Sequence, residues 1–443
     1  MKKWIAQERE RIRRDYFTFL KFPTIGVDPS CADAMHACSQ WLSQQIESAG
    51  LRSELIPTSR FPLIYAEAGE GPHTLLIYGH YDVQPVDPLD QWISPPFEPT
   101  IRDGKVFARG ALDDKGQVWY VVEALRMLKG KLPIRVKLLI EGGEESGSEG
   151  LYEALPLIGP RLKTDSLVVA DFDLLDAQTP AISLGARGLA TMEIGLTGSN
   201  IDLHSGMHGG LAYNPNRALA ELIATLWDKE GRVAVPEFYD AVEEMKPDGL
   251  TFRFNEETYR RQFAIEKLGG EQNRTLLERN WLRPTLEING LSGGYTGPGF
   301  KTVIPARATA KLSCRLVPHQ DPDTIGKQVK AYLEQQAPRG MQLEVKLDHG
   351  GRPFRGRADS PLARALSDAY HEVMGTKAAR ILSGGSIPVI ADLLRYCGGD
   401  VVGMGFGLAE DQIHAPNECF GLDRLEKGIE TLARTIQNLA RAK

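Results

Sequence analysis

The sequence has no long apolar run, and this absence argues against a membrane-spanning helix. No stretch reaches the roughly 18 consecutive apolar residues that such a helix needs. The first twenty residues begin with lysines but contain no uninterrupted apolar segment. They are typical of an amphipathic helix rather than a signal peptide. We therefore expect a cytoplasmic protein without a membrane partner.

Blocks of like charge and paired cysteine motifs are missing as well. The formal net charge is −6 and no basic cluster stands out, which makes a nucleic-acid partner unexpected. The cysteines number five, an odd count, and no CxxC occurs. This usage predicts reduced, mostly buried thiols rather than a disulfide framework.

The length of the chain and its patterning predict two domains. A chain of 443 residues is too long for one ordinary core, and 42% hydrophobic with 25% charged residues is typical of a globular protein. From about 70 to 180, apolar strand-like runs alternate with helical patterns, which predicts a mainly parallel sheet covered by helices. After about residue 350 the same alternation returns.

Between these two α/β stretches the pattern changes. One helix after a first strand, a strand pair, a second helix and a final strand predict a small α+β sandwich with ferredoxin-like order. We therefore expect residues 1–185 and 353–443 to form a catalytic domain of class α/β. Residues 186–352 would be inserted into it.

Titratable residues collect where the apolar runs of the α/β region end. These positions are His80 and Asp82 after "LLIYG", Asp113 and Asp114 in "GALDDKG", Glu141, Glu144 and Glu145 in "IEGGEES", Asp171 and Asp173 in "VVADFD", and His414 in "IHAPNE". Ligands of open α/β sheets bind beyond the carboxyl ends of the strands. The pattern predicts that these side chains meet at one edge of the sheet.

So many carboxylates would repel one another unless a cation lay among them. Two histidines with carboxylates form a mixed ligand set that suits zinc, with manganese or cobalt as alternatives. The candidates outnumber the four ligands of one zinc ion, which favours a site for two metals. Each piece also has an ordinary interpretation: a loop histidine, a helix cap or an acidic turn. Their common topological position favours the metal site.

The spacing of Glu144 and Glu145, and of His80 and Asp82, suggests different roles for the members of each pair. Glu144 and Glu145 are neighbours, so their side chains point in different directions and suit two tasks. One can bind metal while the other reaches a metal-activated water. Asp82 lies two residues from His80, on the same side of an extended chain, where it can orient the imidazole.

Seven motifs together resemble a known family. "GHYDVQP", "RGALDDKG", "EGGEESGS", "DLHSGMHGG", "KTVIPARATAKLSCRLVP", "GGSIPV" and "HAPNE" occur in the order found in a family of zinc-dependent exopeptidases and deacylases. That family includes carnosinase, cytosolic nonspecific dipeptidase, aminoacylase, carboxypeptidase G and succinyl-diaminopimelate desuccinylase. The likeness covers about residues 10–440 and is nearest to the dipeptidase branch.

The resemblance implies roles for the clustered residues. His80 would bind one metal and His414 the other, and Asp113 would bridge both. Glu145 and Asp171 would each complete the protein ligands of one metal. Glu144 would be the general base and later the acid, with Asp82 as the partner of His80. The peptide bond between Asp113 and Asp114 is often cis in such proteins.

The resemblance also assigns roles within the inserted domain, which would be a lid that forms a homodimer. His204 in "DLHSG" would stabilise the oxyanion in the active site of the other subunit. Arg315 would bind the terminal carboxylate of the substrate. Thr302, Gly385 and Ser386 would line the substrate pocket.

These roles predict a dimetal hydrolase that cleaves dipeptides or short peptides with a free C-terminal carboxylate. An N-acyl-amino-acid deacylase with the same metal site is the alternative, because both bonds are amides near a carboxylate. A non-catalytic two-domain binding protein is a remote alternative that would not need the Glu144–Glu145 pair.

Overall fold

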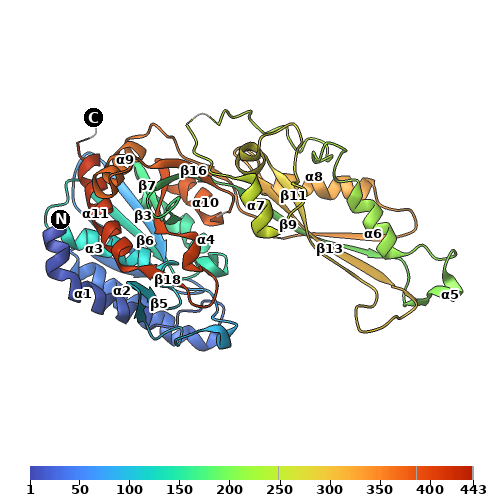
Figure 1. Cartoon of the computed structure of the whole chain (residues 1–443), viewed down its shortest axis with the longest axis horizontal. Coiled ribbons are helices and arrows are strands. Elements are labelled where there is room, and N and C mark those ends of the chain that lie inside the picture. The colour runs from blue at the N-terminus through green and yellow to red at the C-terminus, as the bar shows by residue number, and fades with distance from the viewer. Residues whose placement is uncertain (248, 349, 386, 442–443) are drawn as a thin grey trace. The chain divides into compact units, whose positions relative to one another are not determined.

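The structure, a computed structural model, describes residues 1–247, 249–348, 350–385 and 387–441. The chain divides into two compact units (Figure 1). The first comprises Met1–Gly185, Arg355–Leu382 and Val389–Lys443, and the second comprises Ala186–Phe354 and Ser383–Pro388. Residues 383–388 thus pack with the second unit, whereas the sequence grouped them with the C-terminal part of the catalytic domain. No helix in the described ranges is both long and apolar enough to span a membrane.

A mixed sheet forms the centre of the first unit. The described part of the chain contributes nine strands to it, in the order β1-β2-β6-β3-β7-β17-β8-β15, with β16 paired to β8. Their bounds are β1 Arg52–Ile56, β2 Leu63–Ala68, β3 Thr74–His80, β6 Arg135–Glu141, β7 Ser166–Asp173, β8 Ala181–Ala186, β15 Phe354–Arg355, β16 Ala379–Ser383 and β17 Asp400–Gly407. The central strands β6, β3, β7 and β17 run parallel, whereas β1, β2 and β8 pair antiparallel.

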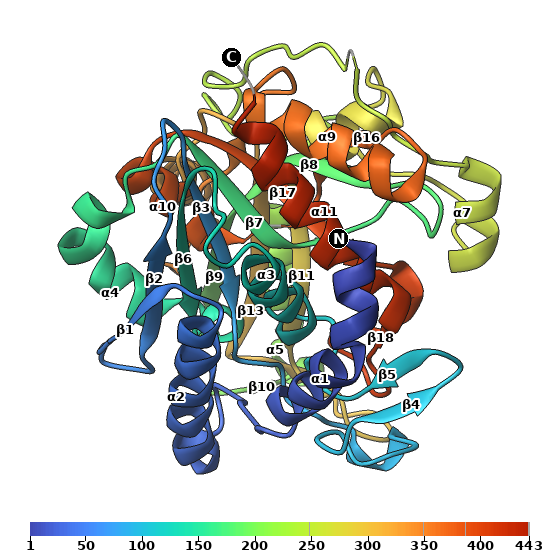
Figure 2. The same ribbon diagram turned by 90° about the vertical axis from the view of Figure 1, so that its left-hand side faces the viewer.

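Helices cover this sheet, so its central strands are buried on both faces. The helices of the unit are α1 Lys2–Leu20, α2 Ala32–Ser48, α3 Lys115–Met127, α4 Glu149–Ile158, α9 Pro361–Met374, α10 Pro388–Cys397 and α11 Leu422–Leu439. Helices α3, α9 and α11 pack together over one face, with α4 and α10 on the opposite side (Figure 2). The continuous apolar run of β3 reflects this double coverage. The predicted α/β class is confirmed, with a mixed rather than mainly parallel sheet.

The second unit is an α+β sandwich. Its sheet has the order β11-β13-β9-β14 and is antiparallel throughout. The strands are β9 Gly188–Thr197, β11 Thr285–Gly293, β13 Arg307–Leu316 and β14 Gln342–Leu347, and helices α6 Pro215–Ala224 and α8 Pro322–Gln335 pack on the sheet. Alternate apolar residues face those helices in one core. The predicted ferredoxin-like order is confirmed.

The polar face of this second sheet meets a long connection between α6 and β11. That connection contains α7, Glu256–Phe263, and a π-helical turn, Glu278–Leu282. A smaller ladder pairs β10, Leu203–His204, with β12, Val303–Ile304. All five cysteines are buried and free of disulfides, as predicted.

Candidate metal centre and substrate-binding residues

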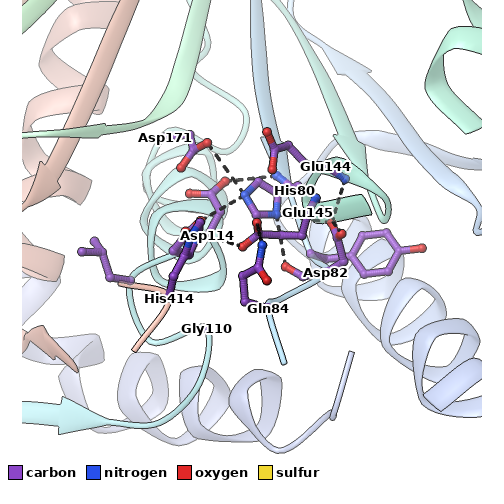
Figure 3. A network of polar contacts seen from close by, with 12 residues as sticks. His80, Asp82, Gln84, Gly110, Asp114, Glu144, Glu145, Asp171 and His414 are labelled. Atoms are coloured by element: carbon purple, nitrogen blue, oxygen red, sulfur yellow. Dashed lines mark hydrogen bonds and ion pairs between the residues drawn. The ribbon is translucent and has the colours of Figure 1, made fainter. Parts of the chain in front are cut away.

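The parallel strands deliver their last residues to one place. His80 ends β3 and lies beside Glu141, the last residue of β6, while Asp171 lies near the end of β7. A short turn after β6 carries Glu144 and Glu145, and the loop after β17 carries His414. Figure 3 shows His80, Glu145, Asp171 and His414 converging from separate segments. The shared edge follows from the parallel register of the strands.

A first group that could hold a metal consists of His80, Asp113 and Asp171. His80 Nε2 lies 3.2 Å from Asp113 Oδ1 and 3.8 Å from Asp171 Oδ2. The imidazole is completely buried, and its Nε2 makes no hydrogen bond with any described residue. Buried ring nitrogens are rarely left without a partner, so this atom fits a metal ligand.

A second group consists of Asp113, Glu145 and His414. His414 Nε2 lies 2.8 Å from Asp113 Oδ2 and 3.3 Å from Glu145 Oε1. The Glu145 Oε1 atom is buried and has no hydrogen-bond partner in the described part of the chain. The two groups share Asp113, which offers one carboxylate oxygen to each. Oxygen and nitrogen ligands in this number fit two divalent cations.

The electrostatics of the cluster show its need for positive charge. Burial raises the pKa of Asp171 well above its usual range, and repulsion from Asp114 and Asp113 adds to this shift. A hydrogen bond to Asp113 and the nearby Glu145 carboxylate raise the pKa of His414 to about 10. Burial disfavours a charge on His80, yet the Asp113 and Asp82 carboxylates still raise its pKa. Cations among these carboxylates would remove the repulsion.

Asp82 contacts both sides of the site. Its Oδ1 lies 3.3 Å from His80 Nδ1, and its main-chain oxygen is 3.1 Å from the same nitrogen. Its carboxylate also accepts hydrogen bonds from the backbone N–H groups of Glu144, at 3.2 Å, and Glu145, at 3.0 Å. The Asp82 side chain therefore contacts the imidazole and also holds the turn that carries both glutamates.

Glu144 is set apart from the two groups of candidate ligands. Burial is the main cause of the raised pKa of its carboxyl, which is about 7; His80 lowers this pKa, whereas Glu145 and Asp82 raise it. A carboxyl with a pKa near neutrality can both accept and return a proton. Glu145, by contrast, is held by a 2.7 Å hydrogen bond from Gln84 Nε2.

The described part of the second unit contains the predicted substrate-binding residues His204, Thr302, Arg315 and Gly385. His204 lies in β10, opposite Val303 of β12, and the backbone N–H of Ser205 donates to Thr302 O at 3.0 Å. His204 and Thr302 are therefore adjacent, and both are exposed. The Gly385 N–H donates to Ser383 Oγ in the segment that packs with this unit. Ser386 lies outside the described residues.

Arg315 lines a cavity of about 490 Å³ within the second unit. Arg187 and Glu287 line the same cavity, and one wall is formed by Phe252, Phe254 and Tyr259. Burial, together with repulsion from Arg315, lowers the pKa of Arg187 to about 10. The Arg187 Nε–H donates to Gly384 O at 3.3 Å. The cavity thus combines positive charge with aromatic surface.

Comparison with known proteins identifies the family. The model of "Peptidase family M20/M25/M40" matches residues 76–438. The chain belongs to this peptidase family. It is 31% identical to human Beta-Ala-His dipeptidase over 442 residues, covering 94% of this chain and 85% of that protein. The family assignment confirms the predicted metallopeptidase class.

Other M20 relatives agree in sequence and in fold. Cys-Gly metallodipeptidase dug1 of Schizosaccharomyces pombe is 31% identical, covering 86% of this chain and 83% of that one. The crystal structure of the M20 metallo-carboxypeptidase Sso-CP2 from Sulfolobus solfataricus is similar at a TM-score of 0.86. It is 32% identical and covers 97% of this chain and 99% of that one.

Several contacts of the M20 site were missed by sequence reasoning. Asp114 is the N-cap residue of α3 but makes no side-chain capping hydrogen bond; its Oδ2 instead accepts the His80 N–H at 3.0 Å. The bond between Asp113 and Asp114 is cis, as the resemblance implied. Gln84 contacts Glu145, and Glu418 contacts the loop that carries Asp113. "YDVQP" and "HAPNE" contain Gln84 and Glu418, so the motifs marked the segments without revealing the contacts.

Proposed function

We propose that this M20 peptidase is a dimetal dipeptidase that hydrolyses the amide bond of dipeptides or short peptides with a free C-terminal carboxylate. The observation that carries the proposal is the pair of potential metal-ligand groups that share Asp113. The deacylase alternative receives no support from the relatives, whose names describe dipeptidases and a carboxypeptidase.

The substrate class follows from these relatives. Their names specify Beta-Ala-His and Cys-Gly dipeptides. We assign to this chain the chemistry they share, namely a short peptide with a free carboxylate beside the scissile bond. An N-acyl amino acid has the same carboxylate, so the two classes are separated by experiment below.

His80, Asp113 and Asp171 would hold one cation, and Asp113, Glu145 and His414 the other. Zinc suits this mixed nitrogen and oxygen set, with manganese or cobalt as alternatives. Bound cations would supply Lewis acidity that polarises the amide carbonyl and makes water more acidic. The Asp82 carboxylate would keep the His80 ring in place through Nδ1.

Glu144 would move the proton. Its carboxylate accepts a proton from the attacking water and returns it to the leaving amine. A pKa raised by burial suits both steps, because the group is neither a strong acid nor a weak base at neutral pH. The Asp82 contact to the Glu144 N–H fixes the backbone from which this carboxylate extends.

His204 and Arg315 would bind the substrate. His204 Nδ1 accepts the Gly206 N–H at 3.0 Å, so its Nε2 carries the ring proton and can donate to an oxyanion. The planar guanidinium of Arg315 can bind a terminal carboxylate through two parallel hydrogen bonds. Thr302, Gly385 and Ser386 would complete the pocket.

We also propose a homodimer formed through the second unit. Large apolar side chains are exposed around His204: Ile201, Met207 and Leu211 are 61%, 71% and 84% exposed. Phe300, in the β11–β12 connection, is fully exposed. Exposed apolar surface of this kind is typical of an interface. Light scattering would report a dimer for the native chain and a monomer for Leu211→Asp; an unchanged mass would contradict the interface.

The five buried free thiols support a cytoplasmic location.

A hydrolysis panel tests the function. Purified protein with added zinc or manganese is given β-Ala-His, Cys-Gly, a tripeptide, its C-terminal amide, and N-acetyl and N-succinyl amino acids. Chelator-sensitive cleavage of the free dipeptides, with the amide resistant, supports the proposal. Cleavage of acyl amino acids alone would assign the chain to the deacylases. No cleavage, with two metals bound, would favour a binding protein.

A further inference from the structure

Glu418 is a buried acid that no catalytic step uses. It lies four residues after His414 and has no exposed surface. Its Oε2 accepts hydrogen bonds from Arg109 Nη1 at 2.9 Å and from the Gly110 N–H at 2.8 Å. Its Oε1 accepts from the Leu112 N–H at 2.9 Å and the Asp113 N–H at 3.0 Å. A carboxylate is needed here, because all four surrounding groups are donors.

Arg109 extends this contact to a third segment. Its Nη2 donates to Pro85 O at 2.8 Å, three residues beyond Asp82, and its side chain is 1% exposed. The Ala108 N–H donates to the Glu418 main-chain oxygen at 3.1 Å. The Arg109–Glu418 pair therefore joins the segments that follow β3, precede α3 and follow His414. Each of these segments contains or adjoins a candidate metal ligand: His80 ends β3, Asp113 precedes α3, and His414 precedes Glu418.

The loop between Arg109 and Asp113 wraps around the Glu418 carboxylate, so that several of its backbone N–H groups bind the two carboxylate oxygens. Gly110 has a φ of +79°, and a Cβ there would lie 2.7 Å from Val83 Cγ1. Glycine permits this conformation, which turns successive N–H groups inward. With the Asp113 N–H bound to Glu418, the backbone from which the Asp113 carboxylate extends is fixed.

We propose that the Arg109–Glu418 ion pair is a positioning device for the metal bridge, which sets Asp113 between the His80 and His414 segments. The proposal rests on the bridging role proposed for Asp113. Removal of the pair would loosen the shared ligand and so weaken both metal positions together. Partners of metal ligands in other proteins change metal affinity by about 10- to 100-fold.

Glu418→Gln tests this with little change of shape. The amide has one acceptor oxygen, so one pair of donors would face an NH₂ group. Metal-free protein is titrated with Co²⁺ by calorimetry and visible absorption, and its thermal unfolding is recorded without metal. We expect two cobalt equivalents in the native chain. In E418Q we expect a 10- to 100-fold loss of affinity at both positions and an altered cobalt spectrum.

Glu123→Gln is the matched control. Glu123 is also fully buried and binds two arginines, Arg11 at 2.6 Å and Arg126 at 3.0 Å. It lies within α3, and these two partners lie in α1 and α3 rather than in the loops that carry the candidate ligands. Both variants should lose apo-protein stability, whereas only E418Q should change cobalt affinity and spectrum. Native cobalt binding in E418Q, or an equal loss in E123Q, would overturn the proposal.

Arg109→Lys covers the case in which E418Q does not fold. Lysine keeps the charge but lacks the planar fork that reaches both Glu418 and Pro85 O. Lower cobalt affinity in R109K supports the positioning role, and native affinity contradicts it. A native chain that binds no cobalt would instead contradict the proposed dimetal function. The two failures are therefore distinguishable.

Discussion

The first unit, which contains the candidate metal centre and is called the catalytic unit below, has a cluster of negative charge in its interior. The second unit has positive charge around a cavity. In the first, Asp113, Glu145 and Asp171 crowd around two histidines, and burial together with repulsion from neighbouring carboxylates raises the pKa of Asp171. In the second, Arg187 and Arg315 line one cavity with Glu287. The first arrangement suits cations and the second suits a carboxylate.

The two regions also differ in how they are held. The acidic cluster is fixed by hydrogen bonds that reach it from separate segments, such as the Asp82 contacts to the Glu144 and Glu145 backbone. The cavity is lined by one sheet face and by the α6–β11 connection. We therefore expect metal content and substrate affinity to respond to different substitutions.

Chelation of the metals should have the largest effect and should act on the catalytic unit alone. Activity should be lost, because the polarising charge is lost. Binding to the folded state stabilises it, so removal of metal should increase amide exchange in the loops that carry Asp113, Glu145 and His414. Hydrogen exchange with mass spectrometry measures this. Equal increases in β9 and β13 of the second unit would contradict the separation.

Glu144→Gln should separate catalysis from metal binding within the catalytic unit. The amide cannot accept a proton, so kcat should fall about 10²- to 10⁴-fold. Metal content, measured by elemental analysis, should stay at the native value. The control is Glu149→Gln. Glu149 lies a few residues after Glu144, and its exposed carboxylate pairs with Arg60. Native turnover in E144Q would show that another group is the base.

Arg315→Met should change substrate binding and leave the metals in place. Charge-assisted hydrogen bonds contribute about 1.5–3 kcal/mol, so kcat/KM should fall about 10- to 150-fold for peptides with a free carboxylate. Steady-state kinetics measure kcat/KM, and elemental analysis measures the metal content. Arg307→Met on the same strand, where Arg307 pairs with Glu344 at the surface, should have no effect. A loss of metal in R315M would contradict the expectation that metal content and substrate affinity respond to different substitutions.

The pH dependence of activity should report the acidic interior. Glu144 must be deprotonated to act as a base, so kcat/KM should fall about tenfold per pH unit below its pKa. That pKa is about 7 in the metal-free chain, and nearby cations favour the charged form and lower it. The acid limb should therefore lie at or below pH 7, and an equivalent limb in the residual activity of E144Q would assign it to another group.

Sequence reasoning went furthest where chemistry and topology coincide. His80, Asp113 and Asp171 could be grouped because each lies near a strand end or helix start, and parallel strands end at one edge. Glu418 could not be placed, since its contact to Asp113 spans 305 positions and no periodicity marks it. The antiparallel pair of β1 and β2 was also missed, because β1 is short and half-exposed.

The cavity of the second unit was beyond sequence reasoning for a related reason. Its aromatic wall comes from the connection between α6 and β11, where Phe252 and Phe254 stack at 5.6 Å. Nothing in the spacing of these aromatics indicates that they face Arg315. The aromatic rings and Arg315 line the same cavity because a long connection folds back over the polar face of the sheet. Local propensity does not determine how such a connection folds.

Phe254→Ala should give the smallest effect, and a selective one. The ring stacks on Phe252 and lies 4.8 Å from Tyr259, so its loss removes apolar surface from the cavity that contains Arg315. If the C-terminal residue of the substrate enters this cavity, kcat/KM should fall roughly tenfold for a large apolar residue and remain unchanged for glycine. Dipeptides that differ only in that residue provide the measurement.

Phe263→Ala is the control for this selectivity. Phe263 is 55% exposed and contacts Tyr259 at 5.0 Å, yet it lies outside the cavity lining. General disturbance of the aromatic cluster would lower activity in both variants for every dipeptide. Selectivity confined to F254A would place the side chain of the C-terminal residue against the aromatic wall, beside the Arg315 guanidinium that we propose binds its carboxylate. Equal losses for glycine and phenylalanine would leave the cavity without a part in substrate choice.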